Sequence, residues 1–228
     1  MECIILAGGL GTRLRSVIGD QPKCMAEVNG KPFLHYMFDY LEEQGCTRLI
    51  LSLGYGHESV TRWLDSTPRR TFGISHVIEQ EPLCTGGGIR LAMQETTDEN
   101  VIVLNGDTMF RISLPGLLDT HLAASAETTL ALKPMRSFDR YGAVRTGEEN
   151  IITAFEEKKY RDQGLINGGI YCITRSDFMS RELPVKFSFE KDYLEAEVAK
   201  GIFAGYTSDA YFIDIGIPGD YEKAQKEL

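Results

Sequence analysis

The most constraining feature of the sequence is a short stretch at residues 2–7, apolar after Glu2, which is followed directly by a glycine-rich loop at residues 8–14. The run contains two β-branched residues and precedes a glycine cluster, which is typical of a strand buried on both faces of a sheet. Gly8, Gly9 and Gly11 remove the Cβ atoms from the turn, so backbone N–H groups can approach an anion closely. The sequence therefore predicts a central strand that ends at a phosphate-binding loop.

Two basic residues follow these glycines, Arg13 and Lys23. Arginine offers a rigid planar set of donors and lysine a mobile point charge, and the two together suit a polyphosphate. Two other glycine-loop motifs are excluded by their spacing. No pair of glycines is followed by Lys and Ser or Thr as in a Walker loop, and Leu14 stands where the dinucleotide fingerprint needs its third glycine.

Strand, turn and helix patterns alternate through the first half of the chain. Further strands are predicted at residues 48–53, 73–78 and 101–104, and helices at residues 33–45, 58–64 and up to about residue 93. This alternation indicates right-handed crossovers and a mostly parallel sheet of the α/β class, flanked by helices. Ligands of such sheets bind at the carboxyl ends of the strands.

The second half of the chain has a different pattern. From about residue 127, shorter strand-like segments are separated by turn residues, and we expect them at residues 128–133, 141–145, 151–155 and 168–173. These segments predict a small β-rich insertion that covers a second substrate. No linker divides the sequence, so we expect a single domain over residues 1–228.

Composition narrows the possible partners and compartments. The formal net charge of −9 argues against nucleic acid or an anionic membrane surface as a partner. No apolar run approaches the roughly 20 residues of a membrane span, and residue 1 leads straight into a strand, so we expect a cytoplasmic protein. The five cysteines are scattered and odd in number, which predicts reduced thiols that pack as small hydrophobic groups.

Two aspartates stand at the ends of apolar runs. Asp107 follows the strand predicted at residues 101–104, and Asp214 follows the apolar residues 210–213. Magnesium commonly takes one or two protein carboxylates together with phosphate oxygens and water. The two aspartates are therefore candidate Mg²⁺ ligands, although either could instead cap a helix or close a turn.

The loop sequence Leu-Ala-Gly-Gly-x-Gly-Thr-Arg-Leu at residues 6–14, with Pro22-Lys23, resembles the signature of the sugar nucleotidyltransferases. These enzymes join a nucleoside triphosphate to a sugar 1-phosphate and release pyrophosphate. The resemblance covers nearly the whole chain, and residues 31–34, 187–194 and 211–218 carry it further. It is strongest to guanylyltransferases that use GTP and D-glycero-α-D-manno-heptose 1-phosphate. Mannose 1-phosphate guanylyltransferases and the uridylyl and thymidylyl relatives are the alternatives.

The resemblance implies a Rossmann-like fold, with a nucleotide-binding half at about residues 1–126 and a sugar-phosphate-binding half at about residues 127–228. It implies Mg²⁺ as cofactor and catalytic roles for Arg13 and Lys23. The nucleotide-binding set that it implies is Leu6, Ala7, Gly8, Gly9, Gly11, Thr12, Arg13, Lys23, Glu79, Pro82, Thr85, Gly86 and Asp107. The sugar-phosphate set is Asn105, Gly142, Glu157, Lys158 and Asn167, and the metal ligands are Asp107 and Asp214.

Several points stay open at this stage. Cys84 stands where the family usually has glycine, and Cys24 stands where proline is common, which weakens detailed inferences about the base pocket. Arg136 and Arg140 are either lid residues or exposed charges. Two other classes also remain: a glycosyltransferase that consumes a nucleotide sugar, and a non-catalytic nucleotide-sugar sensor. A homo-oligomer is possible, but the sequence does not decide it.

Overall fold

The computed structural model describes residues 1–9, 11 and 14–228. Its centre is a parallel sheet, as predicted from the first half of the sequence, and the order of its strands is β6, β1, β4, β5. The strands are β1 (Glu2–Ala7), β4 (Arg48–Leu53), β5 (Gly73–Ile78) and β6 (Asn100–Asn105). β1 lies between two neighbours because its apolar residues can be buried on both faces.

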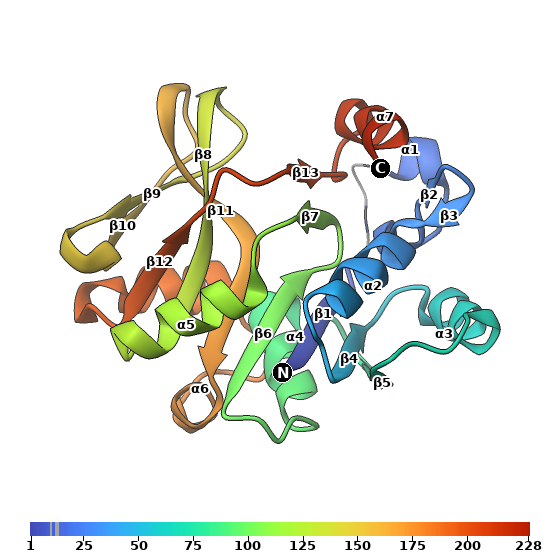
Figure 1. Cartoon of the computed structure of the whole chain (residues 1–228), viewed down its shortest axis with the longest axis horizontal. Helices are drawn as coiled ribbons and strands as arrows, with labels where there is room; N and C mark the ends of the chain where they lie inside the picture. Colours follow the sequence, from blue (N-terminus) through green and yellow to red (C-terminus); the bar gives the residue numbers. More distant parts are fainter. Residues whose placement is uncertain (10, 12–13) are drawn as a thin grey trace.

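Helices cover both faces of this sheet (Figure 1). Neighbouring residues of β1 point into separate apolar cores, since Ile5 belongs to one cluster and Ile4 to another. The core around Ile5 includes residues from α2 (Phe33–Glu43), α3 (His57–Ser66) and α5 (Leu114–Ala124). The core around Ile4 includes α4 (Cys84–Met93), α6 (Arg175–Ser180) and the short helix η3 (Phe189–Glu195).

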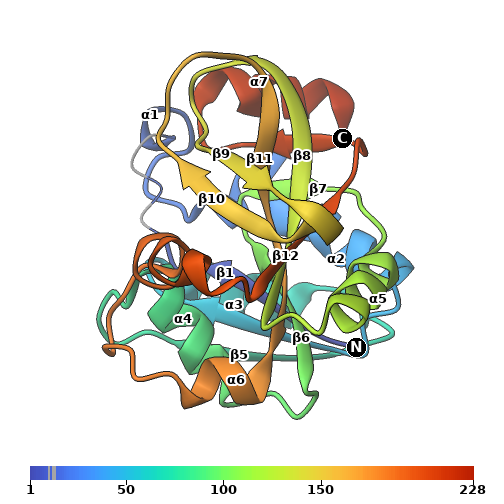
Figure 2. The ribbon, with the colours of Figure 1, turned by 90° about the vertical axis from the view of Figure 1, so that its left-hand side faces the viewer.

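The second half of the chain extends the same sheet. β11 (Arg161–Thr174) runs antiparallel to β6 on one side and to β8 (Thr128–Phe138) on the other. β9 (Ala143–Thr146), β10 (Ile152–Glu156) and β12 (Phe203–Thr207) complete it. The upper parts of β8 and β11 rise above the parallel strands as a long ribbon (Figure 2). The predicted α/β class with a β-rich addition is confirmed, but β8 and β11 are much longer than the strands expected there.

A small separate ribbon joins distant parts of the chain. β7 (Thr108–Phe110) pairs antiparallel with β13 (Phe212–Asp214), and Asp214 lies opposite Thr108. The Phe110 and Phe212 rings meet edge to face with centroids 5.5 Å apart. This ribbon places Asp214 next to Asp107, although 107 positions separate the two residues in the sequence.

The remaining elements are short, apart from the last helix. They are α1 (Arg15–Ile18), η1 (Lys23–Met25), β2 (Glu27–Val28), β3 (Lys31–Pro32), η2 (Glu148–Asn150), η4 (Val198–Lys200) and α7 (Pro218–Glu227). Among the described residues, no helix is both long and apolar enough to cross a membrane. All five cysteines are free thiols, and four of them are buried as predicted, whereas Cys84 is exposed.

Candidate active site

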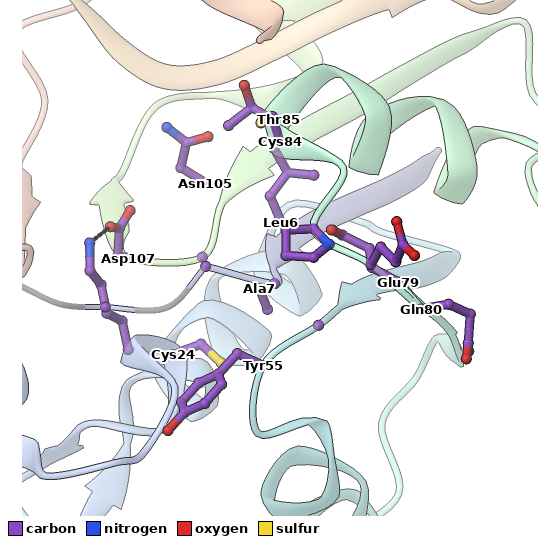
Figure 3. A pocket seen from close by; sticks show the side chains of 18 residues that line it. Leu6, Ala7, Cys24, Tyr55, Glu79, Gln80, Cys84, Thr85, Asn105 and Asp107 are labelled. Carbon is purple, nitrogen blue, oxygen red and sulfur yellow. Dashed lines mark hydrogen bonds and ion pairs between the residues drawn. The ribbon is translucent and has the colours of Figure 1, made fainter. Parts of the chain in front are cut away.

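A cavity of about 600 Å³ opens at the carboxyl ends of the parallel strands. The side chains that line it come from β1, β6, the loop after β5 and the start of α4 (Figure 3). Most of the predicted nucleotide-binding residues line this cavity, namely Leu6, Ala7, Gly8, Gly9, Gly11, Lys23, Glu79, Pro82, Thr85 and Asp107. The rule that ligands bind at strand ends therefore located the cavity from sequence.

Three predicted nucleotide-binding residues are not among the lining residues that the structure describes. Thr12 and Arg13 lie outside the described residues. Gly86 is buried in α4, where an added Cβ would lie 2.2 Å from the ring of Phe187. The absence of a side chain at Gly86 thus allows α4 to pack against the segment that contains Phe187.

Glu79 lies beneath the glycine-rich loop. One carboxylate oxygen accepts a hydrogen bond of 2.9 Å from the Leu83 N–H. A Cβ added at Gly8 would lie 2.7 Å from the other oxygen, and one added at Gly88 would lie 2.9 Å from it. Burial raises the pKa of Glu79, and the Leu83 hydrogen bond opposes that shift. Glu79 therefore fits into space that two glycines leave open, between the loop and α4.

A second cavity, of about 370 Å³, lies beside the first. Four of the five residues predicted to bind the sugar phosphate line it: Asn105, Gly142, Lys158 and Asn167. Glu157 does not line it and is exposed. The two cavities share Asn105 and Asp107. A ligand in either cavity would therefore reach the same acid at the end of β6.

The two candidate metal ligands are close together and held differently. Lys23 Nζ lies 2.6 Å from Asp107 Oδ2, and Figure 3 shows this ion pair as a dashed line. Asp214 accepts hydrogen bonds from the Gly216 N–H at 2.7 Å and from the Tyr141 hydroxyl at 3.3 Å. Burial, and then the charge of Asp107, raise the pKa of Asp214.

These carboxylates suit a hard divalent cation. Two carboxylates that repel each other across one cavity supply the oxygen ligands that Mg²⁺ prefers and leave room for phosphate and water ligands. Within the described part of the chain, no three His, Cys, Asp or Glu side chains gather into a larger metal-binding cluster. The two carboxylates therefore suit a cation whose remaining ligands come from a phosphate and water.

Cys84 has a left-handed backbone conformation, with φ of 61°. Glycine adopts that conformation without strain, whereas a residue with a Cβ does so at a cost. The left-handed backbone conformation at this position thus explains why glycine is usual there in the family. Cys24 is buried, and burial together with the charge of Asp107 raises the pKa of its thiol to about 12.

Several lining residues were not among the predicted set. Tyr55 and Gln80 follow the ends of β4 and β5, so the strand-end rule applied to every strand would have found them. Glu190 and Tyr171 line the second cavity. Glu190 belongs to the segment 187–194 that carries the family resemblance, but no site role was predicted for either residue. Arg140 also lines it and forms an ion pair with Asp220 at 2.6 Å. Arg136 is exposed.

Comparison with known proteins gives consistent results. The model of the nucleotidyl transferase family matches residues 2–228. The chain is 53% identical to a D-glycero-α-D-manno-heptose 1-phosphate guanylyltransferase of Aneurinibacillus thermoaerophilus, over 100% of this chain and 98% of the relative. It is 44% identical to an enzyme of the same name from Campylobacter jejuni, over 97% of each. The crystal structure of HddC from Yersinia pseudotuberculosis complexed with GMP-PN matches with a TM-score of 0.89 and 35% identity, over 99% of this chain and 98% of that chain.

Proposed function

The chain belongs to the nucleotidyl transferase family, and we propose that it joins GTP to D-glycero-α-D-manno-heptose 1-phosphate. The products are GDP-heptose and pyrophosphate. Two full-length relatives carry the name of this activity, and a similar solved structure contains GMP-PN, a guanine nucleotide analogue. The observation that carries the proposal is geometric: a cavity at the strand ends and a second polar cavity meet at Asp107.

The reaction that we propose needs no nucleophile from the protein. A sugar phosphate is mostly dianionic at neutral pH, because its second pKa is about 6. One of its oxygens attacks the α-phosphorus of GTP in line, and the bond to pyrophosphate breaks. The protein then has two tasks, to align the reactants and to stabilise negative charge.

The described residues can be assigned to these tasks. Lys23 would balance charge on the triphosphate and the departing pyrophosphate from the first cavity. Lys158 lines the second cavity and has no ion-pair partner among the described residues, so it is available for the sugar phosphate. Asn105 and Asn167 would bind sugar hydroxyls. Roles for Arg13 on the phosphates and Glu157 on the sugar remain predictions.

Nucleotidyltransferases of this family generally use a divalent metal, and we propose Mg²⁺ held by Asp107 and Asp214. When bound there, the cation would neutralise charge on the phosphate groups. Asp107 suits this task because it borders both cavities. We also propose that the reaction takes place in the cytoplasm, where GTP is available.

Pyrophosphate release from a panel of substrates tests the proposal. Each of the four nucleoside triphosphates is combined, with Mg²⁺, with heptose, mannose, glucose or N-acetylglucosamine 1-phosphate. We expect the highest kcat/KM for GTP with heptose 1-phosphate. Absence of pyrophosphate from every pair would overturn the reaction class and favour a glycosyltransferase or a sensor. A preferred donor other than GTP, or a preferred hexose phosphate, would overturn the specificity.

A further inference from the structure

Glu190 is an acidic side chain in the second cavity that the proposed mechanism does not use. It lies in the first turn of η3, next to the N-cap residue Ser188. The other acids of this cavity, Asp107 and Asp214, are the candidate metal ligands. Neither the proposed mechanism nor the proposed metal site therefore gives Glu190 a role.

Two hydroxyl groups hold the Glu190 carboxylate in place. Its Oε2 atom accepts hydrogen bonds from Thr85 Oγ1 at 2.7 Å and from Ser188 Oγ at 3.0 Å. Thr85 Oγ1 also accepts a hydrogen bond of 2.9 Å from the Phe189 N–H, which fixes the direction of its own proton. Both bonds reach the same carboxylate oxygen, so the carboxylate is oriented before any ligand binds.

Backbone hydrogen bonds and core packing support this arrangement. The N–H groups of Gly86 and Gly87, in the first turn of α4, both donate to the Phe187 carbonyl. Phe187 and Phe189 are buried, and the Phe189 ring packs against Tyr171 with centroids 4.9 Å apart. Thr85 and Glu190 are thus carried by two elements that are joined through backbone and core contacts.

The second oxygen, Oε1, has no hydrogen-bond partner among the described residues, and no described cation pairs with Glu190. A carboxylate oxygen that is free in a polar cavity can accept from a hydroxyl, but it repels a phosphate. Lys158 in the same cavity is the group that attracts the phosphate. Glu190 is therefore suited to the polyhydroxyl part of the ligand rather than to its phosphate.

We propose that Glu190 binds a hydroxyl group of the sugar 1-phosphate, and that Thr85 is the positioning residue that orients it. This inference rests on the proposed function, because it takes the second cavity to be the sugar site. Thr85 also lines the nucleotide cavity. The hydrogen bond from Thr85 to Glu190 thus links the wall of the nucleotide cavity to the sugar.

The variant Glu190→Gln tests the inference. Glutamine keeps an oxygen that can accept from Thr85 and Ser188, but it presents an amide donor where the wild type has an acceptor. We expect KM for the sugar 1-phosphate to rise by about 10- to 100-fold, the usual cost of losing a hydrogen bond to a charged group. KM for GTP should stay within about twofold of wild type. Thr85→Val should raise KM for the sugar phosphate by a smaller factor than Glu190→Gln does.

A set of monodeoxy sugar 1-phosphates identifies the hydroxyl involved. In the wild type, removal of the hydroxyl that Glu190 binds should raise KM for the sugar 1-phosphate. In Glu190→Gln the same removal should have little further effect on KM. The matched control is Glu195→Gln, which changes an exposed acid on the same helix. It should leave both KM values and the melting temperature unchanged.

The outcomes separate this inference from the proposed function. An unchanged KM for the sugar phosphate in Glu190→Gln would overturn the inference, as would an equal rise in both KM values with a lower melting temperature, which indicates a structural role. If the wild type releases no pyrophosphate with any pair, the proposed function fails. Calorimetric titration of wild type and Glu190→Gln with sugar 1-phosphate alone then tests Glu190 directly, and equal affinities would reject its role.

Discussion

The Lys23 ammonium group lies 2.6 Å from the carboxylate of Asp107, the acid that borders both cavities. Before any ligand binds, the cation proposed to act on phosphate thus neutralises the acid proposed to hold the metal. A triphosphate and a divalent cation that bind together offer each of these groups a new partner of opposite charge. The ion pair would therefore link the proposed nucleotide binding to the proposed metal binding.

Replacement of Lys23 by methionine should slow turnover strongly. The variant keeps the length of the side chain but removes the charge that would stabilise the departing pyrophosphate. Loss of one such preorganised group costs roughly 10²–10³ in rate. The measurement is kcat for pyrophosphate release at saturating GTP and sugar phosphate. Lys31→Met, at an exposed position, should retain wild-type turnover. A kcat of Lys23→Met close to that of wild type would contradict the role given to Lys23.

The same variant should bind a divalent cation more tightly in the absence of nucleotide. Lys23 competes with the metal for Asp107, and a unit charge about 4 Å away is worth on the order of 1–4 kcal/mol near a protein surface. We expect the Kd for Mn²⁺, measured by electron paramagnetic resonance, to fall by at least about tenfold in Lys23→Met. The double variant Lys23→Met, Asp107→Asn should not show this increase in Mn²⁺ affinity. Equal Mn²⁺ affinities in wild type and Lys23→Met would show that Lys23 does not compete with the metal for Asp107.

Removal of the metal should abolish the reaction reversibly. Chelation with EDTA is expected to stop pyrophosphate release, and excess Mg²⁺ should restore it. Asp107→Asn and Asp214→Asn should each require more Mg²⁺ for half-maximal activity, because each removes one anionic ligand. Full activity in EDTA, or an unchanged Mg²⁺ requirement in both variants, would be incompatible with the proposed metal site.

Two glycine substitutions should separate folding from nucleotide binding. A Cβ at Gly54 would lie 2.9 Å from the Gly8 carbonyl oxygen, so Gly54→Ala should lower the free energy of unfolding by about 1–3 kcal/mol. A Cβ at Gly9 would meet no described atom within 4 Å, so Gly9→Ala should change stability by less than about 0.5 kcal/mol. Its methyl group would still occupy space next to a bound phosphate, and KM for GTP should rise. Urea unfolding checks the two stabilities, and steady-state kinetics checks KM for GTP. An unchanged stability of Gly54→Ala would contradict the first expectation, and an unchanged KM of Gly9→Ala would contradict the second.

Because of His121, the free energy of unfolding should be lower in mild acid than at neutral pH. Its side chain is buried, and its ring nitrogens lie within hydrogen-bond distance of Thr129, Asn100 and Thr174. Burial lowers the pKa of His121 to about 4, whereas an unfolded histidine has a pKa of about 6.5. Between these values the unfolded chain binds the extra proton, so this contribution to stability is present above about pH 6.5 and is lost as the pH falls toward 4.

The matching measurement is urea unfolding at several pH values. The free energy of unfolding should fall by up to about 1.4 kcal/mol per pH unit through His121 alone. His121→Gln should be less stable than wild type at pH 7.5, and the difference should shrink at pH 5. A difference that does not depend on pH would mean that the folded and unfolded states bind the proton equally.

The sequence predicted the parallel strands and a cavity at their carboxyl ends because both follow from local patterns. The run at residues 2–7 is apolar enough to be a central strand, and polar or glycine residues after each run mark the strand ends. The same logic placed Asp107 correctly at the end of β6. It also applies to Tyr55, which lies two residues after the end of β4 and for which no site role was predicted.

Long-range pairing was the part that the sequence did not predict. β11 begins at Arg161, before the expected strand at residues 168–173, because it pairs with β8 over residues that have no strong strand pattern of their own. The pairing is interrupted between Asn167 and Tyr171, where Gly169 has a φ of 73°. Glu190 reaches the second cavity only through the packing of η3 on α4. Such contacts depend on the assembled core, and no local spacing encodes them.

The ribbon of β7 and β13 also determines when the acid pair can form during synthesis. Asp107 emerges from the ribosome together with the strands that build the first cavity, but its partner emerges more than 100 residues later. A nascent chain that has not yet reached residue 214 contains the residues of all four parallel strands, yet it lacks the second acid that we propose to hold a shared cation. The strands around the first cavity are thus synthesised early, and the pair of acids proposed for the metal is complete only late in synthesis.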